Sequence, residues 1–315
     1  MQARAKRERD SEKLQAQGAA IKEVNGVLVI DKPGGITSHD VVQRIRKLFK
    51  TSKVGHLGTL DPMATGVLPL CIGKATRMGQ FLASSPKEYT GEIRFGFATS
   101  TYDREGERVG AEQSFDQDRS QVETAIRPLI GAFDQMPPLI SAKKIGGEPS
   151  YKLARRGMPI QSPAVPVEVE RFEILRFEPP LVTFRIVCSG GTYVRSLAHD
   201  LGQMLGCGAH LESLRRLRSG DFGIEQAVRL DQVSTADMVP MEKLLEQYPS
   251  ITVEGGLEED RVRHGNPIST PVESGLARIF NKEGEFLAIA SVESGWARPR
   301  VVLMSLTSAE PRRPR

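Results

Sequence analysis

The sequence is poor in cysteine, and this shortage narrows the kinds of site that the chain can build. Only three cysteines occur among 315 residues, with a single tryptophan. Cys71, Cys188 and Cys207 are widely spaced and odd in number, so they show neither a disulfide framework nor the paired spacing of a zinc site. We therefore expect three small buried thiols and no metal centre.

Long apolar runs are also missing. No stretch approaches the roughly 18 apolar residues that a membrane-spanning helix needs. The first twenty residues lack the apolar segment of a secretory signal. These observations favour a cytoplasmic protein that does not use a membrane. The remaining composition, 39% hydrophobic and 26% charged, is ordinary for a globular chain, and the length suits one large domain and a small one.

Acidic residues are slightly outnumbered by basic ones. The formal net charge of +4 and the pI near 9.0 point weakly to a polyanionic partner such as a nucleic acid. Basic residues gather in three places, which are residues 43–50, the arginines at 215, 216 and 218, and the C-terminal tail. Taken singly, each cluster is better explained as a solvated surface.

Residue patterns divide the chain into three parts. Residues 1–23 mix both charge signs without an apolar period, and we expect a disordered or frayed extension. Residues 24–248 combine strand and helix patterns in irregular order, which favours an α+β fold over a doubly wound sheet. Short strands and turns predominate in residues 249–310, where a hairpin is expected at 277–290. We therefore place a domain boundary after residue 248.

Period and turn signals predict individual elements within these parts. Strands are expected at residues 26–30, 89–97, 167–177 and 181–188. Helices are expected after an N-cap at Thr37 or Ser38, at residues 76–82 and 121–130, and from Val194 to a stop at Gly206. Residues 51–70 are rich in glycine, threonine and proline and are interpreted as a long ordered loop, a kind that is often functional.

The most informative part of this loop surrounds Asp61. Gly55, Gly58 and Gly66 permit backbone angles that other residues avoid. Pro62 moves Asp61 out of the helical region and into an extended conformation. The carboxylate is thus presented by a stiffened loop. Because Asp-Pro is also a common turn pair, spacing alone leaves a purely structural role open.

These residues are part of a longer pattern that resembles a known family. Residues 55–69 read G-H-x-G-x-L-D-P-x-A-x-G-x-L-P, and residues 71–76 read C-x-G-x-A-T. The pattern is similar to the signature of the TruB family of tRNA pseudouridine synthases. Four further stretches match in the same order, at 31–38, 87–89, 190–195 and 206–217, and the resemblance covers about residues 24–230. A chance match to five ordered motifs is negligible.

The resemblance implies both a fold and an activity. The fold is the α+β pseudouridine synthase fold, with a mixed, largely antiparallel central sheet flanked by helices and loops. The activity is an isomerase that flips uridine 55 out of the T loop of tRNA and converts it to pseudouridine. RNA recognition through loops, shape and phosphates suits the basic clusters. Isomerisation is redox-neutral, so no cofactor is expected, and we expect a monomer without an obligate protein partner.

The resemblance also implies three catalytic residues. Asp61 matches the family nucleophile, and Arg195 matches the arginine that pairs with it and keeps the carboxylate ionised. Attack on the ribose, attack on the base and assistance to an elimination all stay open. Tyr89 is a core aromatic by its period alone, but it matches the residue that stacks on the flipped uracil.

Further residues are implied to contact the substrate. Tyr193 matches a pocket tyrosine, Leu214 an apolar wall of the pocket, and His56 the histidine that enters the space left by the flipped nucleotide. A contact with a phosphate and a role in local structure are equally open for the basic residues Lys32, Lys143 and Arg215.

The match has departures and leaves alternatives. Ile140 and Pro149 stand where the RNA-gripping insertion of the family carries a tyrosine and often a basic residue, so the grip on RNA is expected to differ in detail. Ser100 stands where many relatives have aspartate, and no role is assigned there. Residues 249–310 resemble the small β-barrel PUA-type RNA-binding domain, although a structural cap without RNA contact is the alternative.

Two classes of function follow from the sequence. The first is the tRNA uridine-55 isomerase. The second is a tRNA-binding or tRNA-folding chaperone in which catalysis is secondary. The presence of Asp61, Tyr89 and Arg195 together favours the first. A third function, a hydrolase that uses a pair of carboxylates, is disfavoured because the motif contains no second positioned acid.

Overall fold

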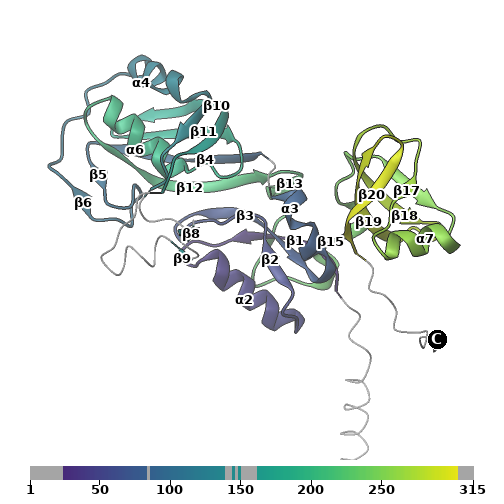
Figure 1. Ribbon diagram of the computed structural model, residues 1–315. Coiled ribbons are helices and arrows are strands. Elements are labelled where there is room, and N and C mark those ends of the chain that lie inside the picture. Colours follow the sequence, from purple (N-terminus) through teal and green to yellow (C-terminus); the bar gives the residue numbers. More distant parts are fainter. Residues whose placement is uncertain (1–23, 84–85, 139–143, 146–147, 150–161, 304–315) are drawn as a thin grey trace, which may run out of the picture.

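The computed structural model describes residues 24–83, 86–138, 144–145, 148–149 and 162–303 (Figure 1). The extension predicted at residues 1–23 and the candidate residues Ile140 and Lys143 lie outside this part. Two sheets of very different size follow one another along the chain, an eleven-stranded sheet and a five-stranded sheet. The larger sheet and its helices carry the motifs discussed above.

The large sheet is mixed and largely antiparallel, as predicted. Its main order is β14-β1-β3-β12-β4-β11-β10-β7, with β15 and β2 added beside β1 and β3 and with β13 beside β12. Only the β1–β14 and β12–β3 pairs are parallel. Its strands are β1 (Gly26–Lys32), β2 (Val54–His56), β3 (Thr65–Ile72), β4 (Lys87–Phe95), β7 (Gly131–Gln135), β10 (Val165–Glu178), β11 (Leu181–Cys188), β12 (Ala209–Ser219), β13 (Phe222–Gly223), β14 (Val228–Arg229) and β15 (Met238–Pro240).

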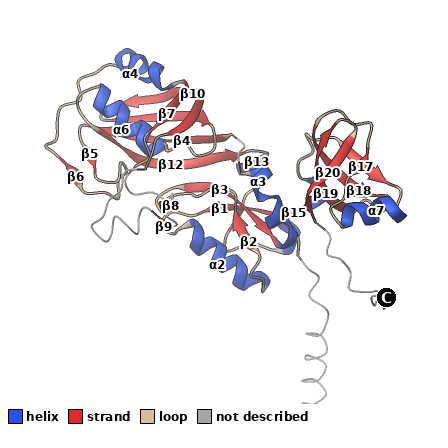
Figure 2. Cartoon of the chain, in the orientation of Figure 1, coloured by secondary structure: helices blue, strands red, loops and turns tan. Residues whose placement is uncertain are grey.

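Three helices cover one face of this sheet (Figure 2). They are α2 (Ser38–Phe49), α4 (Arg119–Ile126) and α6 (Val194–Met204). Their apolar side chains, among them Ile45, Val122 and Leu197, are buried in one core with Leu68 and Phe184 of the sheet. Burial of this common core orients the N-terminus of α6 toward the sheet, and that end of the helix carries Arg195.

The opposite face of the sheet packs against the C-terminal part of the chain. Val29 and Val67 belong to a second core that also contains Leu244, Phe286 and Val301. The short helices η1 (Gly73–Met78) and α3 (Gly79–Leu82) lie on the same side and bury Met78 and Leu82 there. The two sheets are therefore joined through apolar packing as well as through the chain.

Several predicted elements are confirmed with their physical cause. Thr37 is the N-cap of α2 and forms a capping box with Asp40, and the helix ends at Lys50 in the left-handed conformation. Strand β4 alternates between buried and half-exposed residues along its whole length, as the period of residues 89–97 predicts. The pair β10 and β11 is also confirmed, joined through a tight turn at 179–180.

The prediction of a continuous loop over residues 51–70 is wrong. Strand β2 occupies Val54–His56, and β3 begins at Thr65 and pairs with β1 from Gly66 to Ile72. Glycine and proline concealed the second strand, because Gly66 and Pro69 both stand inside it. Only residues 57–64 remain as a loop between the strands, and this segment carries Asp61.

The small sheet follows at residue 250. Its order is β16-β18-β19-β20-β17, and the helix α7 (Gly256–Arg263) accompanies it. The strands are β16 (Ser250–Val253), β17 (Ile268–Ser269), β18 (Gly275–Asn281), β19 (Phe286–Glu293) and β20 (Trp296–Val302). The hairpin predicted at 277–290 is β18–β19. Two short pairs complete the described strands, β5 (Ala98–Thr99) with β6 (Arg108–Val109) and β8 (Lys144–Ile145) with β9 (Glu148–Pro149).

The predicted thiols and the apolar content agree with this fold. All three cysteines are free and buried. Among the described residues, no helix has both the length and the apolar character that crossing a membrane requires.

Candidate active site

One cavity of about 370 Å³ brings together five of the residues singled out from the sequence. It lies where the 57–64 loop, strand β4, strand β12 and the N-terminus of α6 meet. Those five residues are Asp61, Tyr89, Tyr193, Arg195 and Leu214. Residues from four separate parts of the chain thus line one cavity, and neighbouring parts are between 19 and more than 100 residues apart in sequence. The volume is within the range of small-molecule sites, about 300–1,000 Å³.

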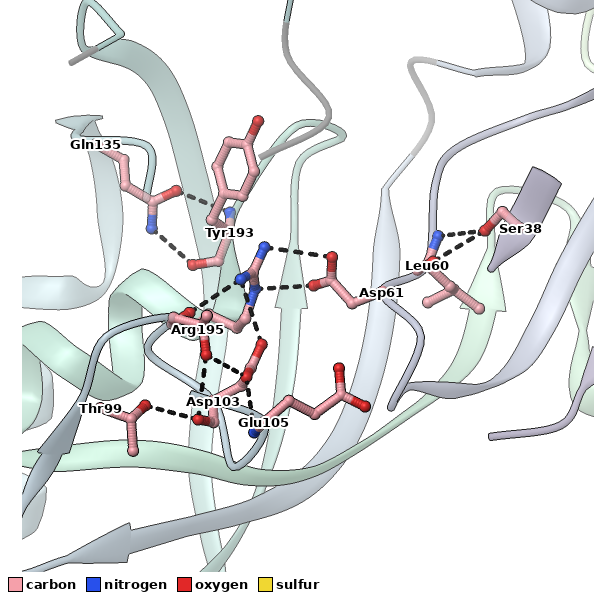
Figure 3. Close-up of polar contacts among 10 residues, drawn as sticks. Ser38, Leu60, Asp61, Thr99, Asp103, Glu105, Gln135, Tyr193 and Arg195 are labelled. Atoms are coloured by element: carbon pink, nitrogen blue, oxygen red, sulfur yellow. Dashed lines mark hydrogen bonds and ion pairs between the residues drawn. The ribbon is translucent and has the colours of Figure 1, made fainter. Parts of the chain in front are cut away.

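The loop that presents Asp61 is anchored on both sides of that residue. Just before it, the Ser38 hydroxyl donates to the Leu60 carbonyl at 3.0 Å and accepts from the Leu60 amide at 2.8 Å (Figure 3). Just after it, the Gly35 amide donates to the Pro62 carbonyl at 2.9 Å. The side chain of Asp61 is still 35% exposed, so the carboxylate is held in place while remaining open to a ligand.

Arg195 faces Asp61 with two nitrogens. Its Nε lies 2.9 Å from Oδ2, and its Nη2 donates to Oδ1 at 3.2 Å. The guanidinium itself is buried, because the side chain is only 7% exposed. A buried cation beside a carboxylate favours the ionised form of the acid, which is the form a nucleophile requires.

A second carboxylate holds the far side of Arg195. Asp103 Oδ2 lies 3.3 Å from Nη1, which also donates to the Thr101 carbonyl at 2.9 Å. Asp103 is itself fixed by the Thr101 hydroxyl at 2.6 Å and the Glu105 amide at 3.0 Å (Figure 3). Sequence reasoning missed Asp103. The signal available was an acidic residue in the 99–106 turn, two positions from a threonine that can cap it.

Tyr89 lies on the buried face of β4, with its side chain in the wall of the cavity. Burial raises the pKa of its hydroxyl, and the neighbouring Arg216 guanidinium lowers that pKa in part through a hydrogen bond and its charge. Arg216 also lines the cavity and is 1% exposed. It had been predicted only as part of a surface cluster, and that interpretation is wrong for this residue.

Tyr193 precedes α6 and is fixed through its backbone. Its amide donates to Gln135 Oε1 at 2.8 Å, and Gln135 Nε2 donates to the Tyr193 carbonyl at 3.1 Å (Figure 3). This reciprocal pair ties the start of α6 to β7. Leu214 contributes an apolar surface from β12 and is buried at 8% exposure. Tyr193 and Leu214 therefore offer the aromatic and apolar surfaces that a planar ring needs.

Other predicted residues lie outside the cavity lining. Lys32 is fully buried and donates to three backbone carbonyls, those of Pro33 at 2.9 Å, Pro62 at 3.1 Å and Ala64 at 2.8 Å. Of the two roles left open for Lys32, this position favours the structural one, because the ammonium group supports the 57–64 loop. Burial lowers its pKa to about 8.

Arg215 and His56 also lie away from the cavity lining. Arg215 makes a bidentate contact with Asp31 at 3.0 and 2.8 Å and remains 39% exposed. Its position is therefore compatible with a phosphate contact and with a role in local structure. His56 ends β2, and burial with the charge of Arg216 lowers its pKa. Its Nδ1 is buried without a hydrogen-bond partner in the described part of the chain.

The remaining sequence features bear on the site less directly. Ser100, where an aspartate is common, accepts a hydrogen bond from the Glu107 amide at 3.1 Å and stabilises the turn that carries Asp103. Pro149 belongs to the short strand β9. Within the described ranges, no group of three or more His, Cys, Asp or Glu residues is arranged to hold a metal ion.

Comparison with known families gives two matches that lie end to end. A family model described as "TruB family pseudouridylate synthase (N terminal domain)" matches residues 46–194. A second, described as "tRNA pseudouridylate synthase B C-terminal domain", matches residues 195–254. Together they include the cavity residues from Gly58 to Arg216.

Curated relatives are similar over most of their length. A protein named tRNA pseudouridine synthase B from Solibacter usitatus (strain Ellin6076) is 45% identical over 282 residues, which cover 85% of this chain and 96% of that protein. One of the same name from Thermobifida fusca (strain YX) is 42% identical over 288 residues, covering 88% and 98%. The similarity therefore extends beyond the catalytic motifs to the C-terminal sheet.

Solved structures share the fold. The structure titled "Crystal Structure of a Cbf5-Nop10-Gar1 Complex" superposes with a TM-score of 0.66 at 27% identity, covering 91% of this chain and 88% of that one. The structure titled "Structure of H/ACA RNP bound to a substrate RNA containing 2'-deoxyuridine" gives 0.65 at 26% identity, covering 89% and 85%. The fold predicted from the sequence is thereby confirmed.

Proposed function

The chain belongs to the TruB family of pseudouridine synthases, and on that premise we propose that it converts uridine 55 in the T loop of tRNA to pseudouridine. The observation that carries the proposal is the Asp61–Arg195 ion pair beside Tyr89 in one cavity. The names and the extent of the curated relatives support tRNA as the substrate. The alternative of a chaperone with secondary catalysis has no observation in its favour.

In the proposed reaction Asp61 is the nucleophile. Its carboxylate is held beside Arg195 and is 35% exposed, so it can reach an extruded nucleotide. The bond between C1′ of the ribose and N1 of uracil breaks, and the electron pair of that bond stays on the base. The uracil rotates within the cavity and forms a new bond from C5 to C1′. The Asp61 carboxylate, which bonds to C1′ as the C1′–N1 bond breaks, leaves C1′ again when the C5–C1′ bond forms. The proton on C5 then leaves, and N1 gains one.

The base must stay bound between cleavage and re-attachment. We assign that task to the ring of Tyr89, the ring of Tyr193 and the side chain of Leu214, which offer flat and apolar surfaces in the cavity wall. Stacking of one base on an aromatic ring is worth about 1–3 kcal/mol, which is enough to keep a detached ring from leaving during a short rotation.

Contacts with the rest of the tRNA are proposed to come from basic residues around the cavity. Arg215 lies in the middle of β12, is 39% exposed and can reach a phosphate if it exchanges Asp31 for that partner. We propose that the catalytic part spans residues 24–248 and that the C-terminal sheet after it adds RNA contacts. A tRNA substrate also supports a cytoplasmic location. Monomeric state stays a prediction.

A tritium-release assay tests the proposal. Transfer RNA labelled with tritium at C5 of uridine loses the label only when C5 forms the new bond, so active enzyme releases one tritium per tRNA. Asp61→Asn keeps the size of the side chain and removes its charge, and we expect release to stop while tRNA binding persists. Absence of release by the wild-type protein, with release by a relative named tRNA pseudouridine synthase B on the same RNA, would reject the proposed function.

A further inference from the structure

Arg216 is a buried cation whose contacts are unusual. Its side chain is 1% exposed and is among the largest fully buried side chains of the described residues. Nε donates to the Val67 carbonyl at 2.7 Å, and Nη2 donates to the Gly58 carbonyl at 3.1 Å. The Arg216 guanidinium also acts on Tyr89, because burial raises the pKa of the Tyr89 hydroxyl and Arg216 lowers it through its charge and a hydrogen bond. All three partners are neutral, and within the described ranges no ion pair joins Arg216 to a carboxylate.

Two lysines near Arg216 add to the positive potential. Burial lowers the pKa of Lys87 and of Lys32, and the charge of Arg216 lowers both further, so both lie close enough to be repelled. Lys87 is 4% exposed and also lines the cavity. Arg195 differs, because its charge is shared between Asp61 and Asp103. The β4–β12 side of the cavity therefore carries a surplus of positive charge.

Such a surplus is costly in the folded protein. A buried charge loses its hydration, and neutral hydrogen bonds recover only part of that loss. A methionine of similar length would fill the same space without this cost. The arrangement is explained if a negative charge forms in the cavity during the reaction, since preorganised positive groups then stabilise the transition state.

We propose that Arg216 is a positioning residue that stabilises the negative charge carried by uracil after the glycosidic bond breaks. The inference rests on the proposed function and extends it. When the C1′–N1 bond breaks, its electron pair remains on the ring and spreads over N1 and the two carbonyl oxygens. Arg216 acts from an almost fully covered position in the cavity wall, through the polarised hydroxyl of Tyr89 and through the Gly58 end of the loop that carries Asp61. It touches neither the ribose nor the carboxylate.

The experiment compares two variants with uridine and 5-fluorouridine at the target position of the tRNA. Fluorine withdraws electrons, so 5-fluorouracil leaves more easily and depends less on outside stabilisation. Arg216→Met removes the charge and keeps the length, whereas Arg216→Lys keeps the charge and loses the forked contacts. Arg171→Met is the matched control, because Arg171 is 53% exposed on β10 and lies 3.8 Å from Glu173.

The readout is the single-turnover rate at which the parent nucleoside disappears, with tRNA affinity measured separately. Arg216→Met is expected to lower the rate for uridine by about 100-fold or more, as loss of a preorganised electrostatic donor does. The loss for 5-fluorouridine is expected to be several-fold smaller. Arg216→Lys is expected to stay within about 10-fold of wild type with an unchanged ratio between the two substrates.

Four outcomes would overturn the inference. Equal losses for both nucleosides would show a role in local structure alone, and weaker tRNA binding with unchanged cleavage would show a phosphate contact. If Arg216→Met does not fold, the Arg216→Lys variant decides the question. If the activity of Arg216→Lys is as low as that of Asp61→Asn, the geometry of the Arg216 contacts matters and its charge does not. A wild-type protein that leaves uridine unchanged would reject the proposed function itself, and this inference with it.

Discussion

Asp103→Asn is the substitution that tests most directly how the nucleophile is held in place. Asparagine has the same shape as aspartate, so the Thr101 hydroxyl and the Glu105 amide keep an acceptor at Oδ1. Only the negative charge behind Arg195 disappears. Among the described residues, Asp61 is then the carboxylate that still faces the guanidinium.

The size of the effect follows from the distances. Arg195 Nη1 and Asp103 Oδ2 are 3.3 Å apart, which corresponds to about 5 kcal/mol of attraction at an effective dielectric constant of about 20. Removing one partner of a buried ion pair costs about 3–5 kcal/mol of stability. Arg195 still pairs with Asp61, which lowers this cost, so we expect Asp103→Asn to lose about 2–3 kcal/mol of stability. A guanidinium shifted toward Asp61 by a fraction of an ångström misaligns the nucleophile, and we expect kcat to fall about 100-fold.

The assay combines tritium release under multiple turnover, urea unfolding and tRNA binding. Asp116→Asn is the control, since Asp116 is exposed and its described contact is with the hydroxyl of Ser114 at 2.8 Å. We expect KM and tRNA affinity to change little, because Asp103 does not line the cavity. Full kcat in a destabilised Asp103→Asn enzyme would refute the reasoning, because Asp103 would then serve the fold and not the alignment of Arg195.

Three further predictions concern the loop and its supports. Ser38→Ala removes both contacts with Leu60, and we expect a stability loss of about 2 kcal/mol, checked by urea unfolding, with kcat about 10-fold lower in the tritium assay. Gly66→Ala would place a Cβ 2.2 Å from the Arg216 carbonyl oxygen at a φ of +97°, so a loss of about 3 kcal/mol or more is expected, and a variant as stable as wild type in urea would contradict this contact. Burial lowers the pKa of Lys32 from 10.5 to about 8. Between these two pH values Lys32 is protonated in the unfolded chain but has lost its proton in the folded protein, so the free energy of unfolding rises with pH. Lys32→Met should reduce that rise between about pH 7.5 and pH 9.5, and an identical rise in both proteins would show that Lys32 does not titrate there.

The elements that the sequence predicted well are those whose pattern is local. The alternation in β4 and the capping box before α2 each lie within about a dozen residues, so period and cap chemistry were sufficient. Strand β12 was not predicted because two irregularities, between Leu211 and Ser213 and between Arg216 and Arg218, break its alternation. Its apolar and charged side chains then match neither a strand nor a helix.

In the candidate site as well, residues with a local sequence signal were predicted and residues that depend on distant partners were not. Asp61 and Arg195 are 134 residues apart, and only the family pattern linked them before the structure placed them in contact. Arg216 was assigned to the surface because charged side chains are rarely fully buried, and nothing local reveals that β12 is covered on both sides at this position. Asp103 was overlooked because its partner is in a helix 92 residues away.

The parallel contact between β3 and β12 has a consequence for catalysis. Only two residue pairs, Thr65 with Arg215 and Gly66 with Arg216, join these strands in the middle of the large sheet. The sheet thus has two halves that meet at a narrow seam, with Asp61 attached to one and Tyr89 and Arg195 to the other. Any tilt about the seam changes the separation of the nucleophile from the ring that holds the base. The angle between the halves is therefore a second determinant of the geometry of the site, beside the residues that line the cavity.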